Sequence, residues 1–387
     1  MVNNNNNSTI KIQKEQASIG YWAAHEQYSS QDLLKFVIEA EKCGFTTTMT
    51  SDHFHPWWHD NAYGNFTWVW IAAAAERTKN MQFVTGVTAP LHRYHPAIIA
   101  QAFASLDVLY PGRIGLGIGT GEAMNEVSLG YDWPNPRFRL AKTKEAIQII
   151  RKLWYGETKK EARQIVRDDI NMAIGTKSKK STNKIKNKAT EKEPKHNNGF
   201  INFNGEYFLI RNAKLYTPPI TYIPLYMAAV GSESTKISAK YSDGLITFLK
   251  PEESKMTLDV FNKTAKKEGK DPSRMDKIAE YKLSYSKDYD RAFKSTMFWR
   301  ATLIKNVFNS SLSDPRKLEE KAKQQVQDKK LKESIDIITS IEDCIKSIEE
   351  YFKVGFTRVY VHSTSPDEVE FVRAFSKTVL PYFNKGA

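Results

Sequence analysis

Short apolar runs alternate with longer amphipathic segments over most of the chain, and this alternation limits the possible folds more than any other feature. Ser30–Cys43 carries apolar residues at helical spacing and ends at Gly44, a common helix stop, and Thr46–Thr50 then has the pattern of a strand. Further strands are expected at Ser18–Trp22, Met81–Val87, Arg113–Ile118, Leu225–Ala229, Gly244–Phe248, Ile278–Ser286 and Arg358–His362, and further helices at Trp68–Glu76, Pro96–Tyr110, Arg137–Trp154, Ser234–Tyr241, Ile341–Val354 and Glu368–Leu380. This order predicts a parallel sheet covered by helices, either doubly wound or closed into a barrel.

The length and composition fit one large domain. A chain of 387 residues with 41% hydrophobic residues can form one α/β barrel with insertions, so we expect a single domain over 18–387. Residues 1–17 contain an asparagine run and are expected to be a disordered polar tail. They carry no apolar segment of the kind found in signal peptides, so a signal peptide is not expected. The two cysteines, Cys43 and Cys344, form no metal-binding motif, and no apolar stretch is long enough to span a membrane. The sequence therefore predicts a cytoplasmic protein without a membrane anchor.

The segment 158–198 interrupts the alternation. Between Lys159 and Lys195 it holds twelve Lys or Arg residues and five Asp or Glu residues, which supplies seven of the thirteen excess positive charges of the chain. It contains no aromatic residue between those positions and is expected to be a flexible insertion. The main interpretation is a solvated surface loop, which makes a nucleic-acid partner unexpected; the alternative is a tether for nucleic acid or an acidic partner. Phe203–Tyr207 then predicts a hairpin that returns to the barrel.

A histidine- and tryptophan-rich motif, Ser51–His59, follows directly after the expected strand Thr46–Thr50. Ligands of parallel α/β proteins bind at the carboxyl ends of the strands, and histidine is the usual proton-transfer residue near neutral pH. His53 is therefore a candidate base that the adjacent Asp52 could orient, and Trp57 offers a flat wall for a ring system. Two alternatives remain open: a metal site built from the three histidines of the motif, and a purely structural loop.

Two glycine-containing motifs also follow expected strands. Glycines recur at every second position from Gly115 to Gly121, just before Glu122, without forming the GxGxxG dinucleotide pattern. They could let the backbone approach a flat ligand closely, or they could serve only tight packing of the strand. Ala228–Ser232 leads into a helix, whose first amide groups suit a phosphate, although Ser232 could instead cap that helix.

Taken together and in this order, the motifs resemble the F420-dependent glucose-6-phosphate dehydrogenases of the bacterial luciferase-like superfamily. The resemblance runs from Ser18 to the last helix and is most specific at Ser51–Trp57, Tyr94–Ala104, Leu109–Pro111, Gly119–Glu126, Phe298–Trp299 and Asp314–Pro315. It implies a (β/α)8 TIM barrel of the luciferase-like type with insertions, coenzyme F420 as cofactor, and a homodimer.

The resemblance also implies roles for individual residues. It makes His53 the base that takes the proton from a substrate hydroxyl, Glu122 the acid near the deazaflavin ring, and Trp57 a stabiliser of the reacting centre. The other implied cofactor-binding residues are Asp52, Asn125, the Gly86–Val87 pair with a cis peptide bond, and the turn Ala229, Val230, Gly231 and Ser232.

The substrate end matches the family only in part. The resemblance assigns the substrate phosphate to Thr247, Lys250 and Lys282, but Met297 stands where the family has an Arg, and Trp22 stands where it has a Lys on the first strand. Arg300 and Lys294 lie three residues on either side of Met297 and are candidates to replace that Arg.

The resulting prediction is a dehydrogenase that transfers a hydride from a sugar phosphate, such as glucose 6-phosphate, to F420. The main alternative is an F420-dependent alcohol or hydroxy-acid dehydrogenase on the same scaffold. An FMN or F420 enzyme of another superfamily type, or a binding protein without catalysis, would be the remaining alternatives.

Overall fold

The computed structural model describes residues 17–156 and 199–384. The expected disordered tail and the expected flexible insertion at 158–198 fall outside these residues, apart from Ala17. No helix in the described residues is both long and apolar enough to cross a membrane.

A closed parallel barrel forms the centre of the described chain. Strand β1 pairs with β2 and β11, the order continues through β3, β4, β7, β8 and β9, and β9 pairs with both β8 and β11, which closes the ring. The barrel strands are β1 (Ser18–Ala23), β2 (Thr47–Thr50), β3 (Gln82–Thr85), β4 (Ile114–Ile118), β7 (Leu225–Ala228), β8 (Gly244–Thr247), β9 (Asp276–Tyr285) and β11 (Arg358–Ser363). The prediction of a TIM barrel is thus confirmed, and the doubly wound alternative was wrong.

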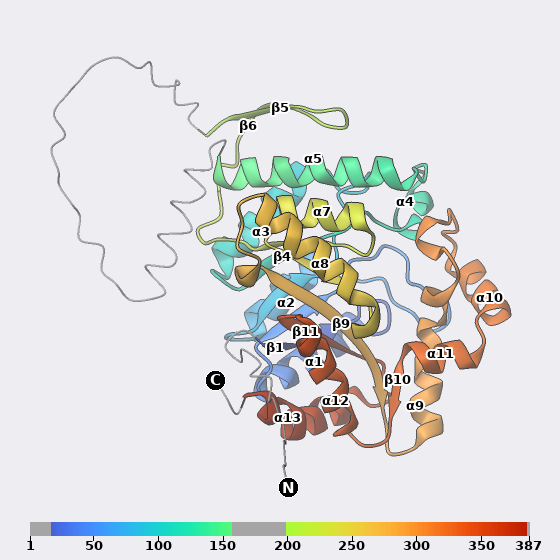
Figure 1. Cartoon of the computed structure of the whole chain (residues 1–387). Coiled ribbons are helices and arrows are strands. Elements are labelled where there is room, and N and C mark those ends of the chain that lie inside the picture. Colours follow the sequence, from blue (N-terminus) through green and yellow to red (C-terminus); the bar gives the residue numbers. More distant parts are fainter. Residues whose placement is uncertain (1–16, 157–198, 385–387) are drawn as a thin grey trace, which may run out of the picture.

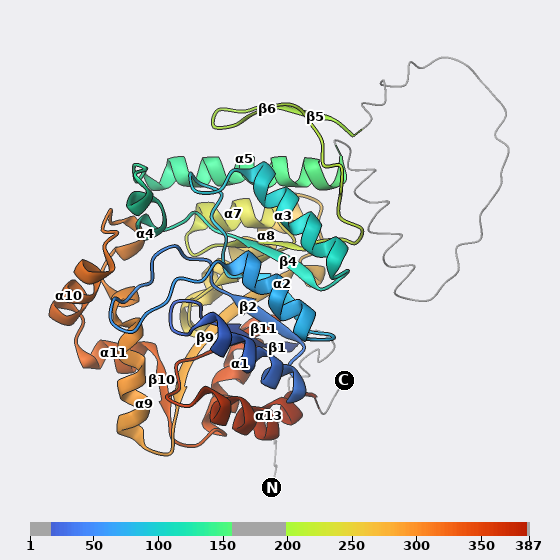
Figure 2. The same cartoon turned by 180° about the vertical axis from the view of Figure 1, so that it is seen from behind.

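Helices surround the barrel (Figures 1 and 2). They are α1 (Ser30–Lys42), α2 (Thr67–Arg77), α3 (Pro96–Leu109), α4 (Ala123–Glu126), α5 (Pro136–Tyr155), α7 (Ser232–Tyr241), α8 (Pro251–Lys267), α9 (Tyr289–Thr296), α10 (Pro315–Gln325), α11 (Asp328–Ser334), α12 (Asp343–Val354) and α13 (Glu368–Asn384), with short 3-10 turns η1 (Val127–Leu129), η2 (Pro272–Arg274), η3 (Met297–Leu303) and η4 (Val307–Asn309). Most expected elements occur within a few residues of their predicted bounds.

The long excursion between β9 and β11 was not predicted. It contains α9, η3, η4, α10, α11 and a short strand, β10 (Asp336–Ile338), which pairs with the end of β9. Figure 1 shows these elements, in orange and red, gathered on one side of the barrel. Because Leu318, Ala322 and Leu331 of this excursion are fully buried in the same apolar cluster as Trp57 and Trp58, the excursion is part of the barrel domain.

Close strand packing explains the alternating glycines. A side chain at Gly117 would lie 1.8 Å from the carbonyl oxygen of Thr85, and one at Gly119 would lie 2.4 Å from a methyl group of Val87. The space beside β4 is therefore filled by the neighbouring strand β3. Packing therefore accounts for Gly117 and Gly119, and an additional role of these glycines toward a flat ligand stays a prediction.

Helix α5 runs from the mouth of the barrel to its floor. It starts close after the Glu122 loop, and the hydroxyl of Tyr155 at its last residue bonds the backbone of Ile223, just before β7. The hairpin of β5 (Ile201–Asn204) and β6 (Leu209–Ala213) follows, as predicted, and Figure 1 shows it on the outer side of α5. Helix α5 thus ends at the floor, away from the carboxyl ends of the strands.

Candidate active site

Acidic and basic side chains from three strand ends meet at the mouth of the barrel. Glu26 follows β1, His53 follows β2, and Glu122 follows β4 as the first residue before α4. Asn125 of α4 connects two of them, since its amide nitrogen lies 3.2 Å from His53 Nδ1 and 3.1 Å from Glu122 Oε2. The structure therefore brings the predicted base and the predicted acid to the same amide group.

The hydrogen bonds of Asn125 define the tautomer of His53. Asn125 Oδ1 accepts from the backbone N–H of Phe54 at 2.7 Å, so its nitrogen must be the group that donates to His53 Nδ1. His53 Nδ1 then carries a lone pair, and its Nε2 carries the proton. That Nε2 lies 3.1 Å from Glu26 Oε1 in a site where the two side chains are only 10% and 2% exposed. In this tautomer the Nδ1 lone pair of His53 faces Asn125, on the Glu122 side of the site.

Glu26 is a site residue that the sequence reasoning missed. Its second oxygen accepts a hydrogen bond from Ser51, whose oxygen also accepts from the backbone N–H of His25. These contacts fix the carboxylate against His53. The sequence position of Glu26 could have indicated its role, because an acid three residues after the first barrel strand must lie at the same mouth as His53.

Asp52 does not contact the imidazole of its neighbour. Its carboxylate accepts from Thr88 at 2.7 Å, from Tyr94 at 3.3 Å and from Arg93 at 3.2 Å. The expectation that Asp52 orients His53 or stabilises its charged form was therefore wrong. Successive residues after a strand point in different directions, and the carboxylate that pairs with His53 comes from another strand.

Aromatic side chains enclose the reaction centre. The ring of Trp57 lies 5.9 Å from His53 and 5.5 Å from Phe308 of η4, and Phe308 stacks in turn on Phe248 after β8. Trp22 of β1 also lies inside the barrel, where its ring edge touches the backbone position of Gly86. These groups make the surroundings of His53 largely apolar.

The residues predicted to hold the cofactor occupy two places at the barrel mouth. The peptide bond between Gly86 and Val87 is cis, as predicted. Gly231 is the residue preceding α7, with no side-chain hydrogen bond to cap the helix, and Val230, Gly231 and Ser232 are exposed. Ser232 is the first helical residue, so the interpretation of Ser232 as the cap was wrong.

A buried charged cluster lies on β9 and β11, next to β1. Glu280 of β9 bonds His362 of β11 at 2.6 Å and Lys282 at 3.3 Å, and the Lys282 ammonium lies 4.4 Å from the centre of the Trp299 ring. Burial alone raises the pKa of Glu280, but Lys282 and His362 outweigh it and lower the pKa to about 2. His362 also stacks on Trp22, with ring centres 5.2 Å apart.

The other candidate phosphate ligands also have partners within the chain. Arg300 pairs with Asp328 and contacts the Met297 sulfur at 2.7 Å. Lys250 Nζ donates to the backbone of Glu333 at 2.6 Å, and the Thr247 side chain accepts a long 3.4 Å bond from Leu249 N–H. Lys294 is exposed near the end of α9.

The three histidines of the sequence motif diverge. His53 bonds Glu26 and Asn125, His55 lies 3.3 Å from the carbonyl oxygen of Ser313, and His59 is exposed. No group of three or more His, Cys, Asp or Glu side chains that could hold a metal ion occurs within residues 17–156 and 199–384. The metal interpretation of this motif was therefore wrong.

The fold and the site together define a TIM-barrel protein in which Glu26, His53, Asn125 and Glu122 meet at the carboxyl ends of the strands. The sequence model of the luciferase-like monooxygenase family matches residues 16–358. The chain therefore belongs to the luciferase-like family.

Curated relatives narrow the comparison. The F420-dependent glucose-6-phosphate dehydrogenase of Microbacterium testaceum is 30% identical over 369 residues, which cover 95% of this chain and 97% of the relative. The F420-dependent glucose-6-phosphate dehydrogenase 2 of Rhodococcus jostii is 32% identical over 372 residues, with 95% and 98% covered.

Solved structures give the same fold. An F420-dependent secondary alcohol dehydrogenase, in complex with an F420–acetone adduct, has a TM-score of 0.80 and 33% identity, with 94% of this chain and 98% of that chain covered. The F420-dependent tetrahydromethanopterin reductase of Methanopyrus kandleri has a TM-score of 0.69 at 18% identity, with 95% and 100% covered, and supports the fold only.

Proposed function

We propose that this protein is an F420-dependent dehydrogenase that oxidises a CH–OH group of a small-molecule substrate. The observation that carries the proposal is the arrangement of Glu26, His53, Asn125 and Glu122, which holds a base and an acid at one opening. Relatives named for F420-dependent oxidation of glucose 6-phosphate, and a solved structure named for an alcohol, support this reaction type.

The residues at the barrel mouth fit a long cofactor with a flat ring and an anionic tail. A Cβ atom at Gly231 would meet no atom within 4 Å, so there is room beside the exposed N-terminus of the ten-residue helix α7. A helix N-terminus favours a phosphate group. We assign the tail to Ala229–Ser232 and the ring to the opening bounded by Asp52, Gly86, Val87 and Asn125.

When bound, F420 would supply the hydride acceptor for the carbinol carbon, and a group of the protein would have to take the hydroxyl proton. The lone pair on His53 Nδ1 can take that proton once a substrate hydroxyl replaces the Asn125 amide as its partner. The imidazolium that forms is stabilised by Glu26 at Nε2, because the two groups are buried and oppositely charged. We assign Glu122 the role of the acid beside the ring position, and Trp57 packs against His53.

We propose a sugar phosphate as the first substrate class, since the relatives named above are named for glucose 6-phosphate. Thr247 ends β8 and Lys250 follows it, while Lys282 lies in the carboxyl half of β9 and Arg300 in η3. An uncharged alcohol is the second class. It is favoured by one observation: Lys282, Arg300 and Lys250 already bind Glu280, Asp328 and the Glu333 backbone, which a phosphate would have to displace.

A substrate panel with purified protein tests both classes. F420 binding is measured first by fluorescence, and reduction is then followed by loss of F420 absorbance with glucose 6-phosphate, other sugar phosphates, and small secondary alcohols. Turnover restricted to unphosphorylated alcohols would end the sugar-phosphate assignment. Binding of FMN without any binding of F420 would overturn the proposed function as a whole.

We also propose a homodimer formed through α2 and α3, which lie side by side in Figure 2 and are joined by a bond from Tyr110 to the backbone of Ala72. Val69 of α2 and Ile98 of α3 are exposed by 69% and 53%, although both are apolar. Val69→Glu should shift the protein to monomers in size-exclusion chromatography with light scattering. A parent protein that is already monomeric would overturn this assembly. Location in the cytoplasm is likewise a proposal, supported by two free cysteines.

A further inference from the structure

His53 and Trp57 lie in a loop that follows the end of β2 at Thr50. We name residues 53–60 the reaction loop. A loop of this kind keeps its place only where other elements hold it. The contacts that hold the second half of this loop come from the unpredicted excursion between β9 and β11, and in particular from α10.

Glu319 of α10 binds the end of the reaction loop directly. One oxygen of its carboxylate accepts hydrogen bonds from the backbone N–H groups of His59 at 3.0 Å and of Asp60 at 3.1 Å. The other oxygen pairs with Lys323, one turn further along the helix. Glu319 is only 5% exposed, so these bonds are made in a site largely shielded from water.

The charge of Glu319 is maintained by these partners. Burial alone raises the pKa of its carboxyl, but the hydrogen bonds from Lys323 and from the two backbone amides outweigh that effect and hold the pKa below its ordinary value. A carboxylate that accepts two amide bonds fixes the position of both peptide groups, and such charge-assisted bonds are stronger than neutral ones.

Lys323 adds a second contact on the neighbouring tryptophan. Its ammonium lies 5.3 Å from the centre of the Trp58 ring, and Trp58 is buried beside Trp57 in the same apolar cluster as Leu318 of α10. The loop is thus held at its backbone by Glu319 and at a side chain by Lys323. Both contacts come from one face of α10.

The preceding residues of the excursion touch the middle of the loop. Phe308 contacts the Trp57 ring at 5.5 Å, and the backbone of Ser313 lies 3.3 Å from the His55 ring. Asn309 accepts a bond from Arg139, which also bonds the backbone of Gly121 next to Glu122. The excursion therefore contacts the chain on both sides of the reaction centre.

We propose that Glu319 is a positioning residue of the reaction centre, which fixes the reaction loop so that His53 and Trp57 keep their places opposite Glu122. The proposal rests on the proposed function, since it assigns Glu319 a role in that reaction. A displacement of about 1 Å in a reacting group can lower a rate by roughly 10²-fold, so a change at Glu319 acts on turnover without any contact to substrate.

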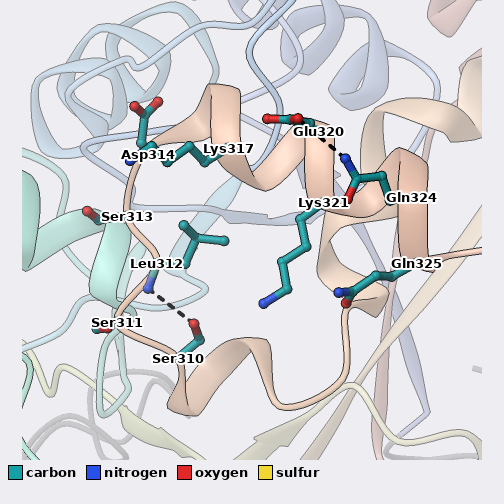
Figure 3. A pocket seen from close by; sticks show the side chains of 10 residues that line it. All are labelled: Ser310, Ser311, Leu312, Ser313, Asp314, Lys317, Glu320, Lys321, Gln324 and Gln325. Atoms are coloured by element: carbon teal, nitrogen blue, oxygen red, sulfur yellow. Dashed lines mark hydrogen bonds between the residues drawn. The ribbon is translucent and has the colours of Figure 1, made fainter.

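The neighbouring residue Glu320 provides a matched control. It lines a groove of about 690 Å³ beside α10. Figure 3 shows its side chain together with Ser311, Lys321 and Gln324. Within the part of the chain that the structure describes, its carboxylate bonds the Gln324 side chain at 3.3 Å and no atom of the reaction loop. Replacement of Glu320 by alanine removes one negative charge from α10, as replacement of Glu319 does, but leaves the contacts with the reaction loop intact.

The experiment compares Glu319→Ala, Glu319→Gln and Glu320→Ala with the parent protein. Glu319→Ala should lower kcat about 10- to 100-fold, with the KM for F420 within about twofold. Glu319→Gln should recover part of the loss, because its amide oxygen can still accept from the two backbone N–H groups. Glu320→Ala should match the parent.

Hydrogen exchange gives a readout that does not depend on activity. Peptides that cover residues 53–60 should exchange faster in Glu319→Ala than in Glu320→Ala, both measured with F420 present. Equal kcat in the two alanine variants would overturn the proposal, as would a lower melting temperature of Glu319→Ala with unchanged kcat and exchange. A parent protein without F420 reduction would end the proposed function, and the exchange data would still decide whether Glu319 holds the loop.

Discussion

Replacement of Glu26 by glutamine removes one negative charge from the reaction centre and leaves the shape of the side chain unchanged. Glu26 lies 3.1 Å from His53 Nε2, and both side chains are almost fully buried. Opposite unit charges about 4 Å apart interact by roughly 4 kcal/mol at an effective dielectric constant of about 20. This interaction exists only after His53 has taken the substrate proton, so it acts on the reaction step and not on the resting enzyme.

The expected loss of rate follows from that energy. In the Glu26→Gln variant the side-chain amide oxygen would still accept the Nε2–H hydrogen bond, and solvent would recover part of the lost charge interaction. We therefore expect a loss of about 3–4 kcal/mol, which equals roughly 10²- to 10³-fold in rate. Single-turnover mixing of enzyme-bound F420 with substrate measures this step apart from product release. F420 affinity and melting temperature serve as controls for binding and folding. A single-turnover rate within about threefold of the parent would refute the role of Glu26.

Three further changes test other parts of the structure. His53→Ala should lower turnover by roughly 10²- to 10⁴-fold with F420 affinity retained, and near-normal turnover would remove His53 from the base role. Asn125→Ala removes the amide that joins His53 and Glu122 and should lower kcat about tenfold. A loss of this size is close to the usual contribution of two hydrogen bonds. A change confined to the KM for F420 would contradict this role. Burial raises the pKa of Glu368 from 4.5 to about 8 in the folded protein, so the folded state binds this proton more tightly than the unfolded chain and stability should fall as the pH rises between these values. The slope from this group is at most about 1.4 kcal/mol per pH unit, and denaturant unfolding at pH 5 and pH 8 should show a smaller decrease for Glu368→Gln than for the parent; equal decreases would show that Glu368 is not the responsible group.

The sequence was sufficient for the barrel because its signal is periodic and local. Runs such as Arg358–His362 and Ser30–Cys43 carry the spacing of strands and helices, and they occur close to their predicted bounds. The excursion around α10 was missed because its helices are short and α10 is rich in Lys, Glu and Gln, with few apolar residues to mark it. The buried residues Leu318 and Ala322 of α10 belong to the same apolar cluster as Trp57 and Trp58.

Partners across the site were harder to predict than the site residues themselves. His53, Asn125 and Glu122 were found from their motifs, and the structure brings them together. The assignment of Asp52 to His53 failed because sequence neighbours were taken as spatial partners, whereas Glu26 reaches His53 from the adjacent strand of the barrel. Which oxygen faces which nitrogen depends on the register of β1 against β2, and one sequence does not contain that information.

The end of α5 at the floor of the barrel has a consequence for how this chain can change over time. Tyr155 and Ile223 meet at the floor of the barrel, and the 20 residues of α5 span about 30 Å from the region of Glu122 to that point. Additions and deletions between α5 and β5 can therefore accumulate with little selective penalty on catalysis. The same position is a suitable place to fuse an affinity tag or a fluorescent reporter, and variation among related genes should concentrate there and not at the reaction loop.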